Sequence, residues 1–354
     1  MRNLLVLIIA TIFFDISFAQ SNKDAVNRFA ASSDVSSVPD LHNQLIKGLT
    51  SDKEKIKAFY DWIAHNINYD VTEATRSFRS PEKQEPENVL KTKKAVCHGY
   101  SALFKELCDR SGIKCYLVSG FSKLNNVFDE SGHTWNVIFL NKQWFQVDVT
   151  WGAGGVNRQR KYVKQYSENY FLQNPDVFLS EHYPFDPMWQ LKDYPVTLKE
   201  YKKSSDFSEP NPAMIPFHYN DTISKWESMN TMLQLLTSAQ RMNRFNAGNK
   251  VIEQELAFAL LENGNGEFEK GNRILSELYP KNTTGNSRGQ KIKPGSEEFK
   301  LKLDSAEQFF IHADFFYKQT KLSNPDENQV LQNNRKALQN NLAIVRKEIS
   351  NLNR

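Results

Sequence analysis

A helix that begins at a cysteine, followed by a strand and a hairpin, limits most strongly what this chain can fold into. From Cys97 to Arg110, apolar side chains recur with the period of a helix that buries one face. The segments 134–140 and 143–149 alternate like strands, and Asn141-Lys142 between them fits a two-residue hairpin turn. We therefore predict an α+β core in which the helix packs on an antiparallel sheet.

Cys97 falls in the first turn of the predicted helix, and this position affects its chemistry. The positive end of the helix dipole and the unpaired N–H groups of the first turn favour a thiolate over a thiol. Because the thiolate is the nucleophilic form, we predict that Cys97 is a nucleophile. Its backbone N–H is one predicted half of an oxyanion hole. The sequence does not identify the second donor.

The predicted hairpin register places a histidine and a carboxylate on one face of the sheet. If Leu140 pairs with Gln143, then His133 and Asp148 become diagonal neighbours, about 7–8 Å apart at the backbone. An imidazole and a carboxylate can meet across that distance. A register slip of one residue would place the two side chains on opposite faces, so this prediction depends on the turn.

Cysteine, histidine and aspartate in this order suit acyl transfer. His133 can accept the thiol proton and pass it to a leaving amine, while Asp148 holds the imidazole in one tautomer. His98 is also near the thiol in sequence, but its side chain leaves the helix in another direction, so we predict His133 as the base. Each of these residues could instead be a buried structural side chain, and their combination is what favours catalysis.

Aromatic side chains near the predicted triad are candidates for substrate contacts. We predict this role for Trp135, Trp151 and Tyr100, although aromatic residues beside strands also commonly fill the core. A basic loop at 157–161 is predicted to be solvated, and selection of acidic substrates is the alternative. Because the cysteines and histidines lack metal-ligand spacing, we predict no metal and no cofactor.

The first nineteen residues have the character of a secretory signal. A short positive start is followed by an apolar run from Leu4 to Phe14 and by small residues before Gln20. We predict cleavage there, a mature chain from about Gln20, and a secreted or periplasmic location. The alternative is an uncleaved signal, which would be the chain's only association with a membrane.

Export makes the three cysteines informative, because disulfides persist outside the cytoplasm. An odd number leaves at least one thiol free. Cys108 and Cys115 lie on either side of the turn at Ser111-Gly112, so they could be bridged, and two buried thiols are the alternative that we favour.

Length and composition leave room for more than one domain. The chain has 354 residues, of which 40% are hydrophobic and 24% charged, with a net charge of +4. Since it has no dense basic tract with interleaved aromatic residues, we predict no nucleic-acid partner. The expected division is a signal peptide at 1–19, a helical segment at 20–50, a catalytic domain at 51–200, a linker at 201–220 and a helical region at 221–354.

Around the catalytic segment, the sequence predicts mostly core elements. Ser51 to Glu54 fits a capping box, and a helical apolar pattern follows it to Ile67. The segment 70–86 is predicted to be a polar connection, 114–120 a buried strand and 121–132 a loose loop.

The C-terminal third is predicted to be helical and carries no recognisable chemistry. Gly264-Asn265-Gly266 and the polar segment 280–294 are expected to interrupt the helices. This region could bind a protein partner, position the catalytic domain or act as a structural brace. The expected helices are 223–242, 251–261, 268–279, 299–317 and 330–352.

Several motifs together resemble the transglutaminase-like superfamily of papain-like cysteine enzymes, and within it the kyphoscoliosis-peptidase type. The resemblance runs from about Lys55 to Leu191. It rests on Asn88-Val89-Leu90, Val96-Cys97-His98-Gly99-Tyr100-Ser101, Gly112-Ile113, Gly120, His133-Thr134-Trp135-Asn136, Trp144, Asp148-Val149-Thr150-Trp151-Gly152, Tyr170-Phe171-Leu172, Pro175, His182-Tyr183-Pro184 and Trp189-Gln190-Leu191. Ala95 and Lys192 depart from the usual pattern, and neither belongs to the triad.

The resemblance implies a papain-like core with Cys97 as nucleophile, His133 as general base and acid, and Asp148 as the orienting carboxylate. It also implies a protein or peptide substrate and an acyl-enzyme step. Within the superfamily, water or an amine can attack the thioester, and some members lack catalysis. The expected function is hydrolysis of peptide or amide bonds. Amine-dependent cross-linking and a catalytically silent peptide-binding scaffold are the alternatives.

Overall fold

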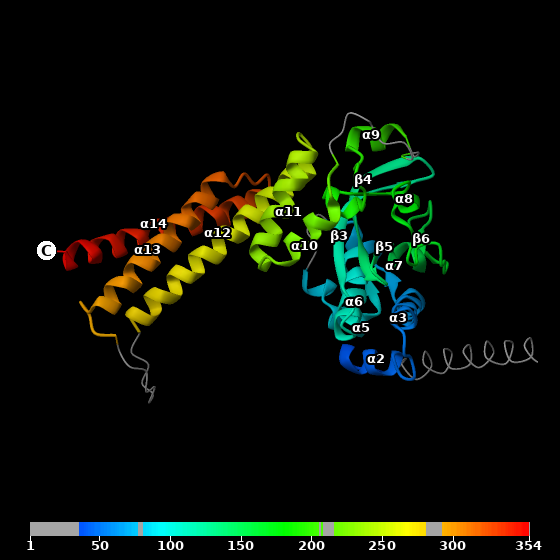
Figure 1. Cartoon of the computed structure of the whole chain (residues 1–354), viewed down its shortest axis with the longest axis horizontal. Coiled ribbons are helices and arrows are strands. Elements are labelled where there is room, and N and C mark those ends of the chain that lie inside the picture. Colours follow the sequence, from blue (N-terminus) through cyan, green and yellow to red (C-terminus); the bar gives the residue numbers. More distant parts are fainter. Residues whose placement is uncertain (1–34, 77–80, 205–206, 208–215, 281–291, 354) are drawn as a thin grey trace, which may run out of the picture. The chain divides into compact units, whose positions relative to one another are not determined.

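The computed structural model describes residues 35–76, 81–204, 207, 216–280 and 292–353 (Figure 1). The chain divides into two compact units, one comprising Met1–Phe185 and Trp189–Phe217 and the other Asp186–Met188 and His218–Arg354. The predicted signal sequence and the start at Gln20 lie outside the described residues. Among the helices of the described residues, we find none whose length and apolar character would let it cross a membrane.

The first unit is a four-stranded antiparallel sheet covered by helices, in the strand order β5-β4-β3-β8. Its strands are β3 (Cys115–Leu124), β4 (Val127–Leu140), β5 (Gln143–Val147) and β8 (His182–Pro184), with short pairs formed by β1 (Asn68–Tyr69) and β2 (Lys94–Ala95) and by β6 (Gly154–Val156) and β7 (Tyr162–Lys164). Its helices are α2 (Val38–Leu45), α3 (Asp52–Asn66), α4 (Val71–Ala74), η1 (Pro81–Gln84), α5 (Pro86–Thr92), α6 (Cys97–Arg110), α7 (Val149–Ala153), α8 (Pro175–Phe178) and α9 (Leu198–Lys203), and η2 (Pro187–Gln190) follows β8.

The two helices that were best marked in the sequence form as predicted. Ser51 caps α3 through a capping box with Glu54, and the apolar face of α3 is buried. Helix α6 begins at Cys97 and ends at Arg110, and it packs against β3 and β4. The start of the helix that carries the cysteine is therefore held next to the sheet.

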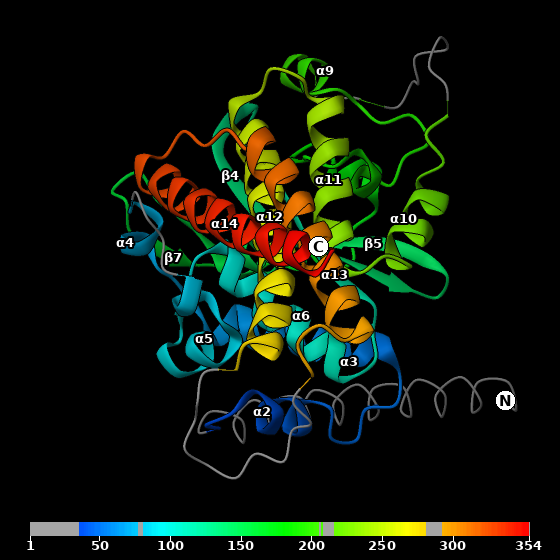
Figure 2. The same cartoon turned by 90° about the vertical axis from the view of Figure 1, so that its left-hand side faces the viewer.

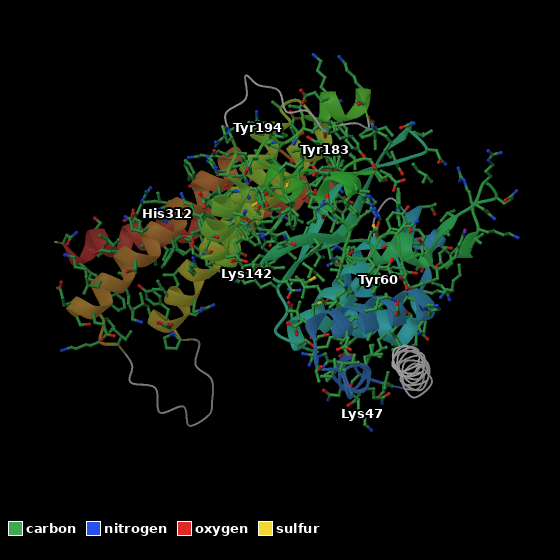
Figure 3. The ribbon with its side chains drawn as sticks, turned by 45° about the vertical axis from the view of Figure 1, so that its right-hand side comes forward. Lys47, Tyr60, Lys142, Tyr183, Tyr194 and His312 are labelled. Atoms are coloured by element: carbon green, nitrogen blue, oxygen red, sulfur yellow. The ribbon has the colours of Figure 1, made fainter. Side chains whose placement is uncertain are left out.

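The hairpin register is also confirmed. Leu140 pairs with Gln143, and Asn141 and Lys142 form the turn with φ values of 51° and 65°. Lys142 is labelled at this turn in Figure 3. Strand β5 nevertheless ends at Val147 and not at residue 149. The chain then enters α7, because the side chain of Asp148 caps that helix by accepting from the N–H groups of Thr150 and Trp151.

One predicted loop, 121–132, is wrong, since it contains strands. Within 121–132, β3 continues to Leu124 and β4 begins at Val127, joined by a tight turn at Asn125 and Asn126 with φ of 51° and 63°. Asparagine tolerates this left-handed conformation, so the pair permits a hairpin. The basic segment 157–161 is an exposed loop, as predicted, and it joins β6 to β7 at the tip of their hairpin.

The segment 70–86 is more ordered than a polar connection, since its described residues include α4 and η1. Gln84, at the end of η1, is buried, and its Oε1 accepts from the backbone N–H of Val96 at 3.1 Å. This bond fixes the backbone directly before Cys97. Tyr60, labelled in Figure 3, lies in α3, and its hydroxyl donates to the carbonyl of Ser167 at 2.6 Å.

The second unit is helical, as predicted, but its helices have different bounds. They are α10 (Tyr219–Glu227), α11 (Thr231–Phe245), α12 (Lys250–Leu278), α13 (Glu297–Gln319) and α14 (Pro325–Leu352), of which α12 and α13 run side by side (Figures 1 and 2). The expected helix 223–242 is divided, because Asn230 caps a new helix.

The predicted break at Gly264 to Gly266 is wrong, since α12 is continuous through it. Gly264 lies against the ring of Tyr317 in α13, and a Cβ atom at Gly264 would be 2.6 Å from that ring. The hydroxyl of Tyr317 donates to Asn265 at 2.8 Å. The glycine therefore allows two helices to approach closely, and its helix-breaking tendency is overcome by packing.

Candidate active site

Cys97 is the first residue of α6 and is 5% exposed. It follows Val96, whose backbone is extended and whose side chain provides no hydrogen bond to cap the helix. The N-terminus of a helix carries a partial positive charge, so α6 directs a favourable field at the sulfur atom of Cys97. This is the local geometry on which a nucleophile and an oxyanion site depend.

His133 in β4 and Asp148 after β5 meet directly. The ring Nε2 of His133 and the carboxylate Oδ2 of Asp148 are 2.7 Å apart, and Asp148 is fully buried. The other oxygen, Oδ1, accepts from the backbone N–H groups of Thr150 and Trp151 at 2.8 and 3.1 Å. The carboxylate therefore caps α7 and holds the imidazole at the same time.

The imidazole of His133 also interacts with the thiol of Cys97, by a side-chain hydrogen bond and by charge. Because Nε2 is bound to Asp148, Nδ1 is the ring atom left for the sulfur. Burial, the largest single influence, favours the neutral ring, but the charges and hydrogen bonds of Asp148 and Cys97 outweigh it and raise the pKa of His133 to about 10. The structure thus brings the three predicted triad residues together.

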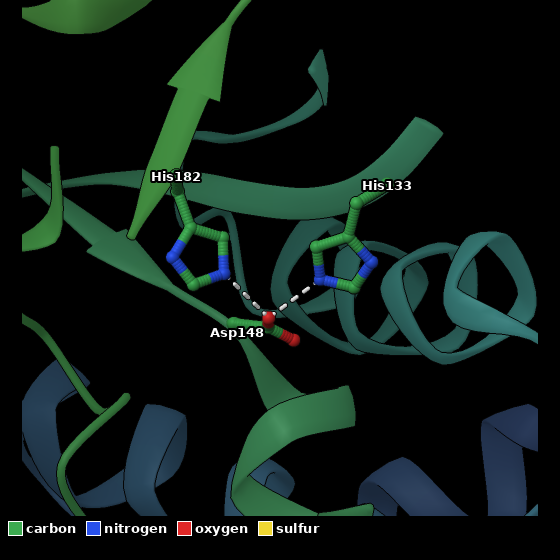
Figure 4. A group of neighbouring side chains, drawn as sticks. All are labelled: His133, Asp148 and His182. Carbon is green, nitrogen blue, oxygen red and sulfur yellow. Dashed lines mark hydrogen bonds and ion pairs between the residues drawn. The ribbon is translucent and has the colours of Figure 1, made fainter. Parts of the chain in front are cut away.

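A second histidine, which our sequence analysis did not assign to the site, contacts the same carboxylate. His182 is the first residue of β8 and lies opposite Ser122 of β3. Its Nε2 is 3.0 Å from Oδ2 of Asp148, so both imidazoles point at one oxygen (Figure 4). The sequence signal for this residue is His182-Tyr183-Pro184, one of the motifs that carry the family resemblance.

The two histidines have opposite protonation tendencies. Burial lowers the pKa of His182 to about 4, although its hydrogen bond to Asp148 and the charge of Asp148 act in the other direction. Burial also disfavours ionised Asp148, but the charges and hydrogen bonds of the two histidines hold the pKa of Asp148 well below its usual range. At neutral pH the cluster is therefore an anionic Asp148 between protonated His133 and neutral His182.

The low pKa of His182 predicts a loss of stability in acid. An unfolded histidine binds a proton as the pH falls through about 6.5, whereas folded His182 does so only near pH 4. Stability is therefore lost as the pH falls from 6.5 towards 4, and by pH 5 this group should lower the free energy of unfolding by about 2 kcal/mol relative to pH 7.5. The raised pKa of His133 acts in the opposite direction over this range, so the measurement is the difference between two proteins. Urea unfolding between pH 7.5 and pH 5 should show a change in the wild type that is about 2 kcal/mol less favourable than the change in His182→Phe. An equal change in the variant would contradict the assignment.

His133, Asp148 and His182 are also ligand-type side chains, with one donor atom each within 4.8 Å of one another. Those atoms already form the two hydrogen bonds to Oδ2, and the side chains of Asp148 and His182 are fully buried. A metal ion could bind them only by displacing both bonds. The geometry fits a hydrogen-bonded triad extended by a histidine better than it fits a metal centre.

A cavity of about 520 Å³ opens beside His133. Its lining comes from β3 and β4, from α7 and the β6–β7 hairpin, and from the segment before α8; it includes Tyr69, Asp129, Trp151, Tyr162 and Tyr170. Of the three aromatic residues predicted to contact substrate, Trp151 lines this cavity. Trp135 and Tyr100 are fully buried; Trp135 donates to Gln146 Oε1 at 2.8 Å, and Tyr100 donates to the carbonyl of Ile67 at 2.8 Å.

The other cysteines and the other histidine considered in the sequence lie outside the triad. Cys108 and Cys115 are free, buried thiols that hydrogen-bond to each other, and burial raises the pKa of Cys108. The bridged alternative therefore does not describe this structure. His98 is exposed on α6, and the imidazole that contacts Cys97 is that of His133.

Comparison with known families identifies the class to which part of the first unit belongs. Residues 39–149 match the family model described as the transglutaminase-like superfamily. These residues of the first unit form a transglutaminase-like domain, and the family resemblance seen in the motifs is confirmed.

Among individual proteins, the chain is similar in sequence to the kyphoscoliosis peptidases. The protein from Mus musculus is 35% identical over 176 residues, which are 48% of this chain and 26% of that protein, and the protein from Homo sapiens is 34% identical over the same extent. The Lim and transglutaminase domain protein ltd-1 of Caenorhabditis elegans is 29% identical over 201 residues, 52% of this chain and 27% of that protein. The chain thus spans about a quarter of the length of these relatives.

Among solved structures, a crystal structure described as that of a TGase matches 45% of this chain and 43% of its own, with 22% identity and a TM-score of 0.29.

Proposed function

We propose that this protein is an exported thiol enzyme that hydrolyses peptide or amide bonds through a thioester. The observation that carries the proposal is that one imidazole, that of His133, contacts both the thiol of Cys97 and the carboxylate of Asp148. A structural histidine would not need a nucleophile on one nitrogen and a buried anion on the other. Export rests on the signal-like first nineteen residues.

Each group has one task in the proposed reaction. His133 takes the proton of Cys97, and the thiolate attacks the carbonyl carbon of the substrate amide. The resulting oxyanion is stabilised by the backbone N–H at Cys97. As the C–N bond breaks, His133 gives its proton to the departing amine, and a thioester to Cys97 remains. His133 then removes a proton from water, which attacks the thioester and releases the carboxylic acid and the thiol.

Asp148 supports both proton transfers without being protonated itself. It accepts from Nε2 of His133, which keeps Nδ1 free to exchange a proton with sulfur or water. The raised pKa of His133 favours the ion pair of thiolate and imidazolium before substrate binds.

The cavity beside His133 is the proposed binding place for the peptide. It is lined by aromatic residues, including Trp151 and Tyr170, and by polar residues such as Ser122 and Asn169. Such a lining suits a peptide segment, which offers apolar side chains and backbone hydrogen-bonding groups at once.

Alkylation by iodoacetamide tests the proposal directly. At pH 6 an ordinary thiol, with a pKa of about 8.5, is about 0.3% thiolate, whereas a thiol paired with imidazolium is mostly thiolate. We expect rapid labelling of Cys97 at pH 6 and a fall of about 300-fold in His133→Ala. Peptide mapping by mass spectrometry assigns the label to Cys97.

The control for this experiment is Cys97→Ala, which reports any labelling of the buried thiols Cys108 and Cys115. If wild-type Cys97 reacted only as the pH approached 8.5, the thiol would be unactivated and the scaffold alternative would replace the enzyme. Peptide and cell-wall amide libraries, compared between the wild type and Cys97→Ala, would then identify the substrate. Incorporation of a labelled primary amine into protein would indicate cross-linking in place of hydrolysis.

A further inference from the structure

We propose that His182 is a positioning residue of this active site, which donates a hydrogen bond to Asp148 and thereby fixes the carboxylate that orients His133. The inference rests on the proposed function, because it assigns His182 a role in activating Cys97. It extends the proposed triad to a fourth side chain.

The hydrogen bonds of Asp148 support this role. Oδ1 accepts from two backbone N–H groups, and Oδ2 accepts from His133 and His182 (Figure 4). A carboxylate has about four lone-pair positions, so these four donors fill them. Without His182, Oδ2 would keep a single donor, and His133 alone would determine where that oxygen lies.

His182 can donate because it is neutral and in one tautomer. Asp148 is an anion and only accepts, so Nε2 of His182 must carry the hydrogen. Its other nitrogen, Nδ1, is buried and has no hydrogen-bond partner. The ionisable groups acting on this ring are Asp148 and His133, and burial keeps the ring uncharged. Neutral His182 therefore stabilises the Asp148 carboxylate through a hydrogen bond. Because it carries no charge, it does not compete with the His133 imidazolium for that carboxylate.

The surroundings of His182 hold its ring in one orientation. The ring stacks on Phe178, with ring centroids 3.9 Å apart and planes 19° apart, and it lies 4.5 Å from the ring of Trp151 and 5.2 Å from that of Trp135. Strand pairing of β8 with β3 holds the backbone of the same residue. Leaving Nδ1 of His182 buried without a hydrogen-bond partner costs free energy. Packing stability alone therefore explains a histidine in this aromatic pocket poorly.

Two substitutions separate positioning from simple packing. His182→Phe keeps an aromatic ring for stacking but removes the donor, so it should preserve or raise the melting temperature. His182→Gln keeps an N–H at nearly the same reach but places an amide oxygen in the aromatic pocket, so it should lower the melting temperature.

The readout is the rate of Cys97 alkylation by iodoacetamide as a function of pH, measured by mass spectrometry on the full chain. We expect His182→Phe to react about tenfold more slowly than the wild type at pH 6, with the rise in rate displaced to higher pH, because a displaced Asp148 stabilises the imidazolium less well. His182→Gln should recover most of the rate and the wild-type pH dependence despite its lower melting temperature.

The matched control is His42→Gln, which alters another buried histidine of the same unit, one whose Nε2 contacts Ser111 at 2.8 Å. It should leave the pH profile unchanged. If His182→Phe has the wild-type profile, or if the rates of both His182 variants simply follow their melting temperatures, His182 is a packing residue and the inference is overturned. If the wild type itself shows no reactive thiol at pH 6, the proposed function fails instead, so the two failures are distinguishable.

Discussion

Replacing Asp148 with asparagine should lower the turnover of an amide substrate by about 10⁴-fold. The carboxylate accepts four hydrogen bonds, two from backbone N–H groups and two from imidazoles. An asparagine amide has one accepting oxygen and one donating NH₂ group, so it cannot satisfy both pairs of donors. Since α7 requires its cap, the NH₂ group would face the histidines.

That orientation changes the tautomer of His133. Nε2 would have to accept a hydrogen bond, so the ring hydrogen would move to Nδ1, the atom that faces Cys97. A ring already protonated there cannot take the thiol proton. The same exchange of tautomer is the reason why the corresponding substitution in serine proteases has an effect of about four orders of magnitude.

The measurement is turnover with the substrate found by the library screen, together with alkylation of Cys97 at pH 6, which should fall towards the 300-fold limit of an unpaired thiol. Asp70→Asn is the matched control. Asp70 also caps a helix, accepting from the N–H of Glu73 at 2.9 Å. Because asparagine caps helices well, this variant should behave like the wild type. Retention of turnover within tenfold in Asp148→Asn would remove Asp148 from the mechanism.

The parts of the site that the sequence predicted are those set by local rules. The start of α6 follows from the periodicity of its own apolar residues, and the pairing of Leu140 with Gln143 follows from a two-residue turn. Those two features suffice to place Cys97 at a helix N-terminus and His133 within reach of Asp148. Even there, the strand ended one residue before Asp148, because a capping carboxylate started a helix that strand alternation could not reveal.

The parts that could not be predicted depend on contacts between distant segments. His182 reaches Asp148 only because β8 pairs with β3, about sixty residues earlier in the chain. A three-residue strand has no periodicity of its own to mark it. The continuity of α12 through Gly264 is similar, because its cause is the ring of Tyr317 on another helix and not a local preference.

Gly120→Ala should destabilise the first unit by about 3 kcal/mol or more, since Gly120 is one of the positions at which β3 pairs with both of its neighbours. It pairs with His133 on one side and Pro184 on the other. A Cβ atom there would lie 2.2 Å from the carbonyl oxygen of Tyr183 and 2.4 Å from the Trp135 ring. Neither a paired backbone nor a fully buried indole can move cheaply.

Urea unfolding followed by tryptophan fluorescence measures this effect, because Trp226 is the one tryptophan of the second unit. The matched control is Gly155→Ala, where an added Cβ meets nothing within 4 Å, and its free energy of unfolding should stay within about 0.5 kcal/mol of the wild type. Because the clash separates β8 from β3, Gly120→Ala should also withdraw His182 from Asp148 and slow alkylation of Cys97 as His182→Phe does. Wild-type stability in Gly120→Ala would mean that β8 does not pack on β3 at this glycine, and the hydrogen bond from His182 to Asp148 would then lose its structural basis.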